Sequence, residues 1–244
     1  MHNLIYYALS AVVVLITLTV HEYAHALAAY KMGDPTARNL GRLTLNPLKH
    51  LDPIGALCLL IFHFGWAKPV PINARNFKNP RRGFAISALA GPAINLIISF
   101  FSALIYLVLL RFFSGIGFSS VFLLNVAQNS ILFFLLLHII NLGIAVFNLI
   151  PVPPLDGSRI LGLLLPSKYY FAIMRHERTI YYVLIGWLVV GDLLSDALLK
   201  LDFILANPIA TIFATAISLS NILGFVTSAL SSLMIGFWSL LPFL

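Results

Sequence analysis

The sequence has very little charge. Asp, Glu, Lys and Arg make up only 9% of its 244 residues, against roughly 25% in an average soluble domain. Hydrophobic residues make up 60% of the chain, and its mean hydropathy is +0.97. So few polar side chains cannot cover a surface that faces water. This composition excludes an ordinary cytosolic globular protein and a disordered chain.

Cysteine and acidic residues are also scarce. The single cysteine, Cys58, excludes an internal disulfide framework and a cysteine-based zinc site. Eight acidic residues against 15 Lys and Arg leave a formal net charge of +7. An excess of basic residues indicates either a polyanionic partner or, in a membrane protein, basic loops on the cytoplasmic side.

Long apolar runs are abundant. A helix needs about 20 mostly apolar residues to cross a bilayer. We therefore expect an all-α polytopic membrane protein with about five or six transmembrane helices, forming a single integral membrane domain over residues 1–244. The apolar runs occupy residues 4–30, 84–110, 121–150, 180–199 and 203–244, and the last is long enough for one span or two.

The stretch 32–79 between the first two runs is different, because it is rich in Pro, Gly and Asn. Residues 41–46 and 68–72 alternate as strands do, although two prolines restrict the second segment to a sheet edge. The apolar stretch 54–64 is too short to span as a helix. We expect a small β-strand and re-entrant element at the membrane surface, whose strand edge either receives an extended substrate or caps the fold.

The distribution of basic residues indicates the orientation. Nine of the 15 lie in residues 31–82 and four in residues 159–178, whereas Arg111 and Lys200 fall on the opposite side of the spans. Basic residues concentrate in cytoplasmic loops. This predicts a multi-pass protein of the cell membrane with its N-terminus outside. The net charge is then explained by topology, and no nucleic-acid partner is expected.

The motif His21-Glu22-Tyr23-Ala24-His25 lies near the end of the first run. Residues four apart share a helix face, so His21 and His25 can offer two imidazoles to one metal ion. Glu22 lies beside that face, where it can take a proton from a water molecule at the metal. Ionisable groups inside an apolar span are costly unless they are paired or liganded. The other interpretation is a patch of histidines bonded to backbone or a neighbouring helix, which has no need of the carboxylate.

Catalytic zinc usually has three protein ligands and a water, so the two histidines need a further ligand. Asp156 is the favoured candidate because it follows the three prolines of residues 151–154, which cannot continue a helix. Extended backbone at membrane depth is tolerated where it lines a protein cavity. Gly157 allows a turn or a close approach there. The alternative is that Asp156 caps a helix. Asp34 and Asp52 lie in the polar loop, where we expect them to be turn or capping residues.

His138 stands alone in the third apolar run, without a second histidine or carboxylate at helical spacing. A buried polar group is normally hydrogen-bonded within the protein. We therefore expect His138 to be a packing residue rather than a metal ligand.

Two motifs together carry a resemblance to a known family. The first is the His21–His25 motif, and the second is Asn-x-x-Pro-x-x-Pro-x-Asp-Gly at residues 148–157. Gly91-Pro92-Ala93-Ile94-Asn95 and the stretch 33–47 add less specific matches. With these motifs, over about residues 15–165, the chain resembles the site-2 protease family of intramembrane zinc metalloproteases (peptidase family M50), in its compact prokaryotic branch.

The resemblance implies one zinc ion per chain, held by His21, His25 and Asp156. It implies that Glu22 is the catalytic acid/base and that Asn148 orients the substrate or stabilises the oxyanion. The expected activity is hydrolysis of peptide bonds in or near transmembrane segments of membrane protein substrates, as in regulated intramembrane proteolysis.

The implied catalytic core covers about residues 1–165, with additional helices over 180–244. The expected partners are the lipid bilayer and a transmembrane substrate, and no oligomeric state is implied. Two other functions remain open. One is a membrane transporter that uses the His/Asp cluster as its ion site, and the other is a non-catalytic relative.

Overall fold

The computed structural model of the chain describes residues 2–52, 55, 67–118, 120–200, 211–212, 215–216 and 218–241. Five helices within these residues are long and apolar enough to cross a membrane: α1 (His2–Lys31), α4 (Pro80–Ser114), α5 (Val121–Leu149), α8 (Glu177–Leu198) and α11 (Leu219–Ser239). The prediction of a helical multi-pass membrane protein is therefore confirmed. Of the 203–244 tail, the described residues contain one span, α11.

The helix boundaries follow local sequence signals. Helix α4 begins before its apolar run because the Asn79 side chain accepts a hydrogen bond from the Arg82 N–H at 3.1 Å, with Pro80 in the first helical position. Ser120 caps α5 in the same way through the N–H of Phe122. The first turns of both helices are thereby provided with acceptors for N–H groups that have no partner within the helix.

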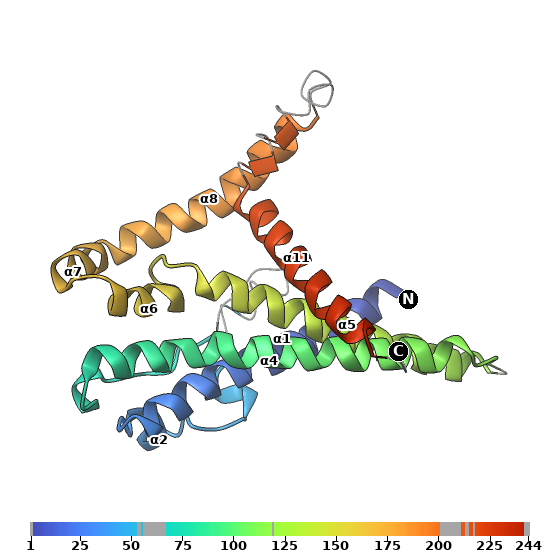
Figure 1. Ribbon diagram of the computed structural model, residues 1–244, viewed down its shortest axis with the longest axis horizontal. Helices are drawn as coiled ribbons and strands as arrows, with labels where there is room; N and C mark the ends of the chain where they lie inside the picture. The colour runs from blue at the N-terminus through green and yellow to red at the C-terminus, as the bar shows by residue number, and fades with distance from the viewer. Residues whose placement is uncertain are drawn as a thin grey trace.

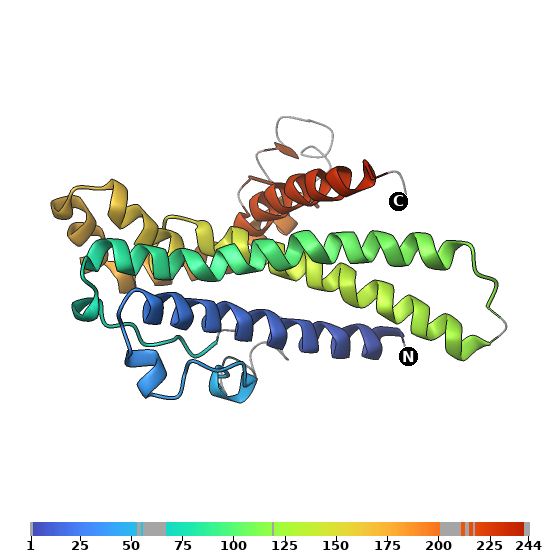
Figure 2. The ribbon, with the colours of Figure 1, turned by 60° about the horizontal axis from the view of Figure 1, so that its bottom comes forward.

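Helices α1, α4 and α5 form the centre of the molecule and lie side by side (Figures 1 and 2). Helix α4 packs against both α1 and α5, and α5 also contacts α1. The buried positions of α4 are nearly all small residues: Gly83, Ala85, Ser87, Ala88, Gly91, Pro92, Asn95, Ser99, Ser102 and Ala103. Small residues let membrane helices approach closely. Helix α4 therefore lies close against the face of α1 that carries the histidine motif.

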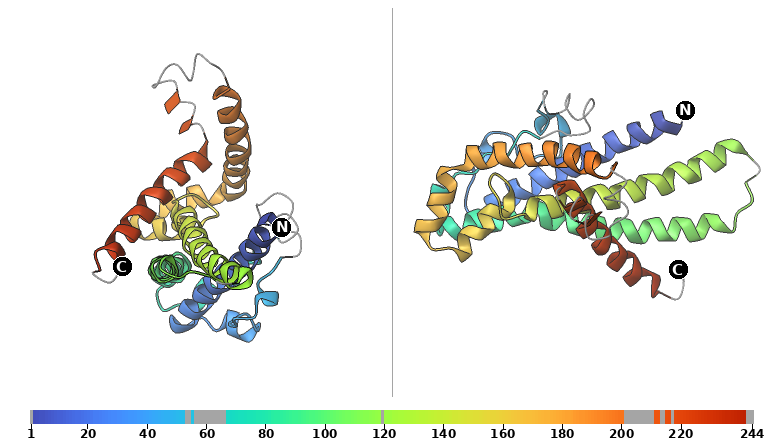
Figure 3. Two further views of the ribbon diagram at one scale, coloured as in Figure 1. Left: turned by 90° about the vertical axis from the view of Figure 1, so that its right-hand side faces the viewer. Right: turned by 90° about the horizontal axis from the view of Figure 1, so that it is seen from above.

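Helix α11 crosses α5 and α4 obliquely (Figure 3). His138 of α5 is fully buried, with its two ring nitrogens 2.8 Å from the hydroxyl oxygens of Ser99 on α4 and Ser231 on α11. The Trp238 indole N–H donates to the carbonyl of Phe100 at 2.8 Å. His138 is thus a hydrogen-bonded packing residue that joins three helices.

The expected β-strands are wrong. In the described part of the chain the single β feature is one isolated antiparallel bridge between Leu51 and Ala67. Residues 41–46 form turns and bends, and residues 68–73 are extended without a partner strand. The alternating pattern in 68–73 reflects an extended segment whose N–H groups bind side chains, because one donates to Glu22 on α1 and another to Asp34 just after α1.

The predicted re-entrant stretch 54–64 lies outside the described residues, apart from Gly55. The shorter elements on either side of it are α2 (Thr36–Asn39), η1 (Pro47–Lys49) and η2 (Ala74–Asn76). They lie between the end of α1 and the start of α4. Elements α2 and η1 contact α1, and η2 contacts α4.

The proline-rich segment after α5 turns the chain back toward the centre. It contains a cis peptide bond between Pro153 and Pro154 and leads into α6 (Asp156–Leu164) and α7 (Ser167–Arg175). Helix α6 packs against α4 and α5. Asp156, the first residue of α6, therefore lies beside the central helices.

Candidate metal centre

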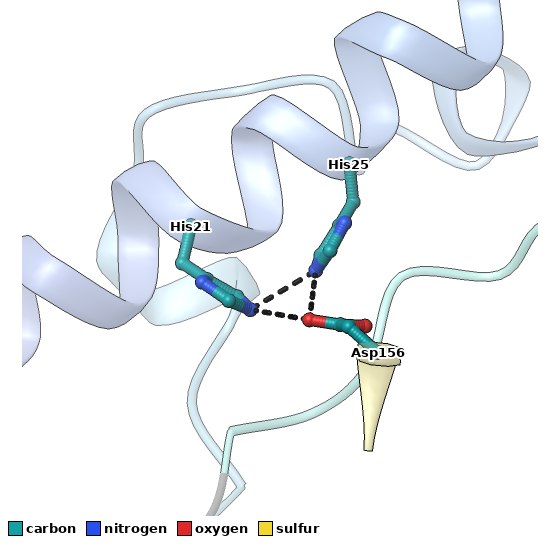
Figure 4. Close-up of side chains that lie close together, drawn as sticks. All are labelled: His21, His25 and Asp156. Atoms are coloured by element: carbon teal, nitrogen blue, oxygen red, sulfur yellow. Dashed lines mark hydrogen bonds and ion pairs between the residues drawn. The ribbon is translucent and has the colours of Figure 1, made fainter. Parts of the chain in front are cut away.

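Helix α1 places two imidazoles side by side. His21 and His25 are one turn apart and buried, with 4% and 7% of their surfaces exposed. Their Nε2 atoms are 3.0 Å apart, and their rings stand at 90° to one another. Figure 4 shows both rings pointing away from the helix toward the same point. The i, i+4 spacing therefore gives the shared face expected from helical geometry.

Asp156 joins this pair from the start of α6 (Figure 4). Its Oδ2 atom lies 3.2 Å from Nε2 of His21 and 3.2 Å from Nε2 of His25. The structure thus brings together three side chains from segments 131 to 135 positions apart in the sequence.

Gly157 explains how α6 comes so close to the end of α5. A Cβ atom on Gly157 would lie 2.3 Å from the carbonyl oxygen of Leu149 and 2.5 Å from that of Ile150. The N-cap of α6 is Leu155, and no side chain caps this helix. The capping alternative for Asp156 is therefore not what the structure shows, since the carboxylate faces the histidines.

The cluster fits a metal cation. The Nδ1–H of His25 donates to the carbonyl of Ser87 at 2.7 Å, which leaves a lone pair on Nε2. Oδ2 of Asp156 is buried and has no hydrogen-bond partner among the described residues. Tetrahedral zinc with N and O ligands at 2.0–2.1 Å separates its ligand atoms by about 3.3 Å, close to the observed 3.0–3.2 Å. Two imidazoles and one carboxylate are a donor set of catalytic zinc sites.

The other two predicted site residues lie nearby in the sequence but are differently engaged. Glu22 is half-buried, and its Oε2 atom accepts a hydrogen bond from the backbone N–H of Val70 at 2.9 Å. Asn148 is also half-buried, and its amide donates to the carbonyl of Ile144 in the preceding turn of α5 at 3.0 Å. The Asn148 amide is thus bonded within its own helix rather than to the three clustered side chains.

Comparison with known proteins decides the family. The family model described as Peptidase family M50 matches residues 9–191. The chain belongs to this family. The predicted resemblance to site-2 proteases is therefore confirmed, and the match extends beyond the 15–165 region in which the motifs lie.

The relatives found among curated proteins are named as zinc metalloproteases. "Putative zinc metalloprotease YwhC" of Bacillus subtilis is 43% identical over 171 residues, which cover 68% of this chain and 75% of that protein. "Putative zinc metalloprotease Rip2" of Mycolicibacterium smegmatis is 34% identical over 156 residues, covering 59% of this chain and 52% of the relative. "Zinc metalloprotease MJ0392" of Methanocaldococcus jannaschii is 27% identical over 169 residues, covering 69% and 38%. No solved structure matches.

The family and these relatives show that the chain is a metalloprotease. They favour zinc as its metal. They do not support the transporter or non-catalytic interpretations that the sequence left open.

In this M50 member, residues of α4 bind the Nδ1 atoms of both histidines, the ring nitrogens that do not face Asp156. His25 is oriented by the Ser87 carbonyl, and Nδ1 of His21 lies 3.1 Å from the side-chain amide of Asn95. Asn95 is fully buried, and its Oδ1 atom has no partner among the described residues. If His21 offers Nε2 to a metal, its Nδ1 carries the hydrogen. A half-turn of the Asn95 amide, which exchanges its nitrogen and oxygen, then gives Oδ1 that hydrogen.

Replacing Asn95 with Leu is expected to weaken zinc binding by about 10- to 100-fold, the usual cost of losing the hydrogen-bond partner of a metal-binding histidine. Leu has a similar volume but cannot accept a hydrogen bond from His21. Competition with a metal-binding dye measures the affinity. Asn39, exposed at the end of α2, provides the control substitution Asn39→Leu, which should bind zinc as the unmodified protein does. Equal zinc affinity in the two variants would show that Asn95 does not support His21.

Sequence reasoning missed Asn95, Gly91 and Val70. The Gly91-Pro92-Ala93-Ile94-Asn95 motif held a signal for the first two, but only as part of a family likeness. A Cβ on Gly91 would lie 2.5 Å from Nε2 of His25, so this glycine makes room for the imidazoles. Val70 contacts Glu22 through its backbone N–H, and no pattern of residue types reveals such a contact.

Proposed function

We propose that this protein is an intramembrane zinc metalloprotease that hydrolyses peptide bonds in or near the transmembrane segments of membrane protein substrates. One zinc ion per chain would be held by His21, His25 and Asp156. The observation that carries the proposal is the convergence of these three ligand atoms between helices apolar enough to cross a membrane.

When bound, zinc supplies Lewis acidity that activates water and polarises the scissile carbonyl. Glu22 accepts a proton from the attacking water as the water oxygen bonds to the carbonyl carbon, and it later donates this proton to the leaving amine as the C–N bond breaks. The Ser87 carbonyl keeps His25 in the tautomer with a free Nε2.

Asn148 is the candidate donor to the developing oxyanion. In the structure its amide is bonded to the Ile144 carbonyl. The amide nitrogen carries a second hydrogen, which is the proposed donor to the scissile carbonyl oxygen.

The site is proposed to face the cytoplasm in the cell membrane, with the N-terminus outside. Thirteen of the 15 basic residues lie in the segments 31–82 and 159–178, and basic residues mark cytoplasmic loops. Residues 1–244 would form a single membrane domain. The substrate must be extended at the site, because a helix engages its peptide groups in its own hydrogen bonds.

Metal removal tests the proposal. The purified protein should cleave at least one member of a panel of single-span substrates, lose this activity when a chelator removes its zinc, and regain it when Zn²⁺ is returned. Elemental analysis should give about one zinc per chain. Peptide cleavage that survives complete removal of the metal would contradict the mechanism.

A further inference from the structure

The extended segment 68–73 contacts the proposed base, Glu22. Val70 stands between Pro69 and Pro71, and proline has no backbone N–H. Val70 therefore carries the one backbone donor of these three residues. It donates to Oε2 of Glu22 at 2.9 Å.

The beginning of this segment is held by the loop that follows α2. The Lys68 N–H donates to the carbonyl of His50 at 2.8 Å. The carbonyl of Lys68 accepts a hydrogen bond from the guanidinium of Arg42 at 2.6 Å. Arg42 is buried, with 8% of its surface exposed. Lys68 is thus fixed through both of its backbone polar groups.

The end of the segment is held by Asp34. One carboxylate oxygen accepts the Asn73 N–H at 2.7 Å, and the other accepts the Asn76 side-chain amide at 2.7 Å. The second oxygen also accepts hydrogen bonds from the N–H and hydroxyl of Thr36. Asp34 is fully buried. Its role therefore extends beyond the local turn expected from the sequence.

Asp34 is itself rigidly placed at the end of α1. Gly33 has a φ of 108°, and its N–H donates to the backbone carbonyl of Tyr30. The N–H of Asp34 donates to the backbone carbonyl of Ala29 at 2.9 Å. These two bonds form a Schellman motif, in which glycine adopts the left-handed conformation. Helix α1 therefore fixes both Glu22 and Asp34, the residues that bind the segment.

The Asp34 carboxylate is suited to this role at neutral pH. Burial raises the pKa of the Asp34 carboxyl, but hydrogen bonds from Thr36, Asn76 and Asn73 outweigh that effect and hold the pKa below its ordinary value. The carboxylate is therefore ionised and accepts from all its donors.

We infer that the backbone N–H of Val70 is a positioning group for Glu22, held in place by Asp34 at one end of the segment and by Arg42 at the other. By binding Oε2 it orients the carboxylate and leaves Oε1 to receive the proton of the attacking water. A free glutamate side chain would lose rotamer entropy at each turnover, and a fixed donor removes part of that cost. This inference rests on the proposed function.

Replacing Val70 with Pro tests it. Val70 precedes Pro71 and is therefore already restricted to extended conformations, so proline removes the N–H while keeping the backbone extended. The matched control is Val70→Ala, which removes most of the side chain but keeps the donor. We expect V70P to have a kcat about tenfold or more below that of V70A, the usual effect of losing a hydrogen bond to a charged group. KM and zinc content should be equal in the two variants.

Asp34→Asn provides a second, independent variant, because it leaves Val70 unchanged and weakens its anchor. We expect D34N to bind zinc but to have a lower kcat with little change in KM. A purely structural role would instead lower thermal stability and zinc content together with activity. If V70P fails to fold, D34N decides the matter. The inference is overturned if V70P matches V70A in kcat, or if D34N keeps the kcat of the unmodified protein.

Glu22→Gln separates this inference from the proposed function. If Glu22→Gln retains full cleavage, the proposed base is wrong and the proposed function fails at that step. If Glu22→Gln loses cleavage while V70P and V70A remain equal, Glu22 is the base and only the positioning role of Val70 is wrong.

Discussion

The variant Glu22→Gln should lose peptide cleavage by about 10³-fold in kcat, within the range of general acid–base catalysis, while keeping its zinc. Glutamine has nearly the same shape and can still accept the Val70 N–H through its amide oxygen. It cannot take a proton from the attacking water at neutral pH. Cleavage of a single-span substrate gives kcat, and elemental analysis of the same sample gives the zinc content.

Glu177→Gln is the matched control, because Glu177 is the one other glutamate of the chain. Its carboxylate pairs with Arg159 at 2.9 Å and belongs to no metal cluster among the described residues. A partly exposed ion pair contributes little to stability, so this variant should cleave at nearly the normal rate. Loss of zinc from Glu22→Gln would show that Glu22 supports metal binding instead of proton transfer.

The variant Gly91→Ala should lose zinc. The added Cβ would lie 2.5 Å from Cε1 and Nε2 of His25 and 2.7 Å from Cε1 of His21, closer than nonbonded carbon and nitrogen atoms approach. The imidazoles must therefore move away from Asp156, or α1 must separate from α4. We expect zinc affinity to fall by about 100-fold or more, because displacing the ligands themselves costs at least as much as losing a hydrogen-bond partner of a ligand. Cleavage should fall with it.

Gly143→Ala on α5 is the control for Gly91→Ala. A Cβ on Gly143 meets no atom within 4 Å. Alanine is favoured over glycine inside a helix by about 1 kcal/mol, so Gly143→Ala should be as stable as the unmodified protein or more stable, with normal zinc affinity. Zinc competition and thermal unfolding compare the two variants. Normal zinc affinity in Gly91→Ala would mean that the histidines do not need the space beside α4.

Patterns within one helix were readable from the sequence. The apolar runs predict the spans because crossing a bilayer requires about 20 apolar residues in a row, and four of the runs coincide with α1, α4, α5 and α8. The face shared by His21 and His25 follows from the helical repeat alone. In each case the interaction that determines the structure lies within a few turns of the residues themselves.

The strand prediction failed for the opposite reason. Alternation in residues 68–73 indicates an extended chain, but a strand also requires a neighbour to pair with. Here the N–H groups of Lys68, Val70 and Asn73 bind the carbonyl of His50, the side chain of Glu22 on α1 and the side chain of Asp34 just after α1. Which partner receives a backbone N–H depends on segments far away in the sequence.

By itself the sequence determined that this protein is a multi-pass helical membrane protein with a His-Glu-x-x-His helix and a distant Pro-rich Asp156 segment, because burial in lipid and helical spacing act locally. The tertiary structure decided which groups surround those residues. It placed Asp156 beside both imidazoles and the small residue Gly91 of α4 against the same two rings. It also placed the Val70 N–H within hydrogen-bonding distance of Glu22. These contacts join residues 48 to 135 positions apart, and only the tertiary arrangement of α1, α4, α6 and the segment 68–73 brings them together.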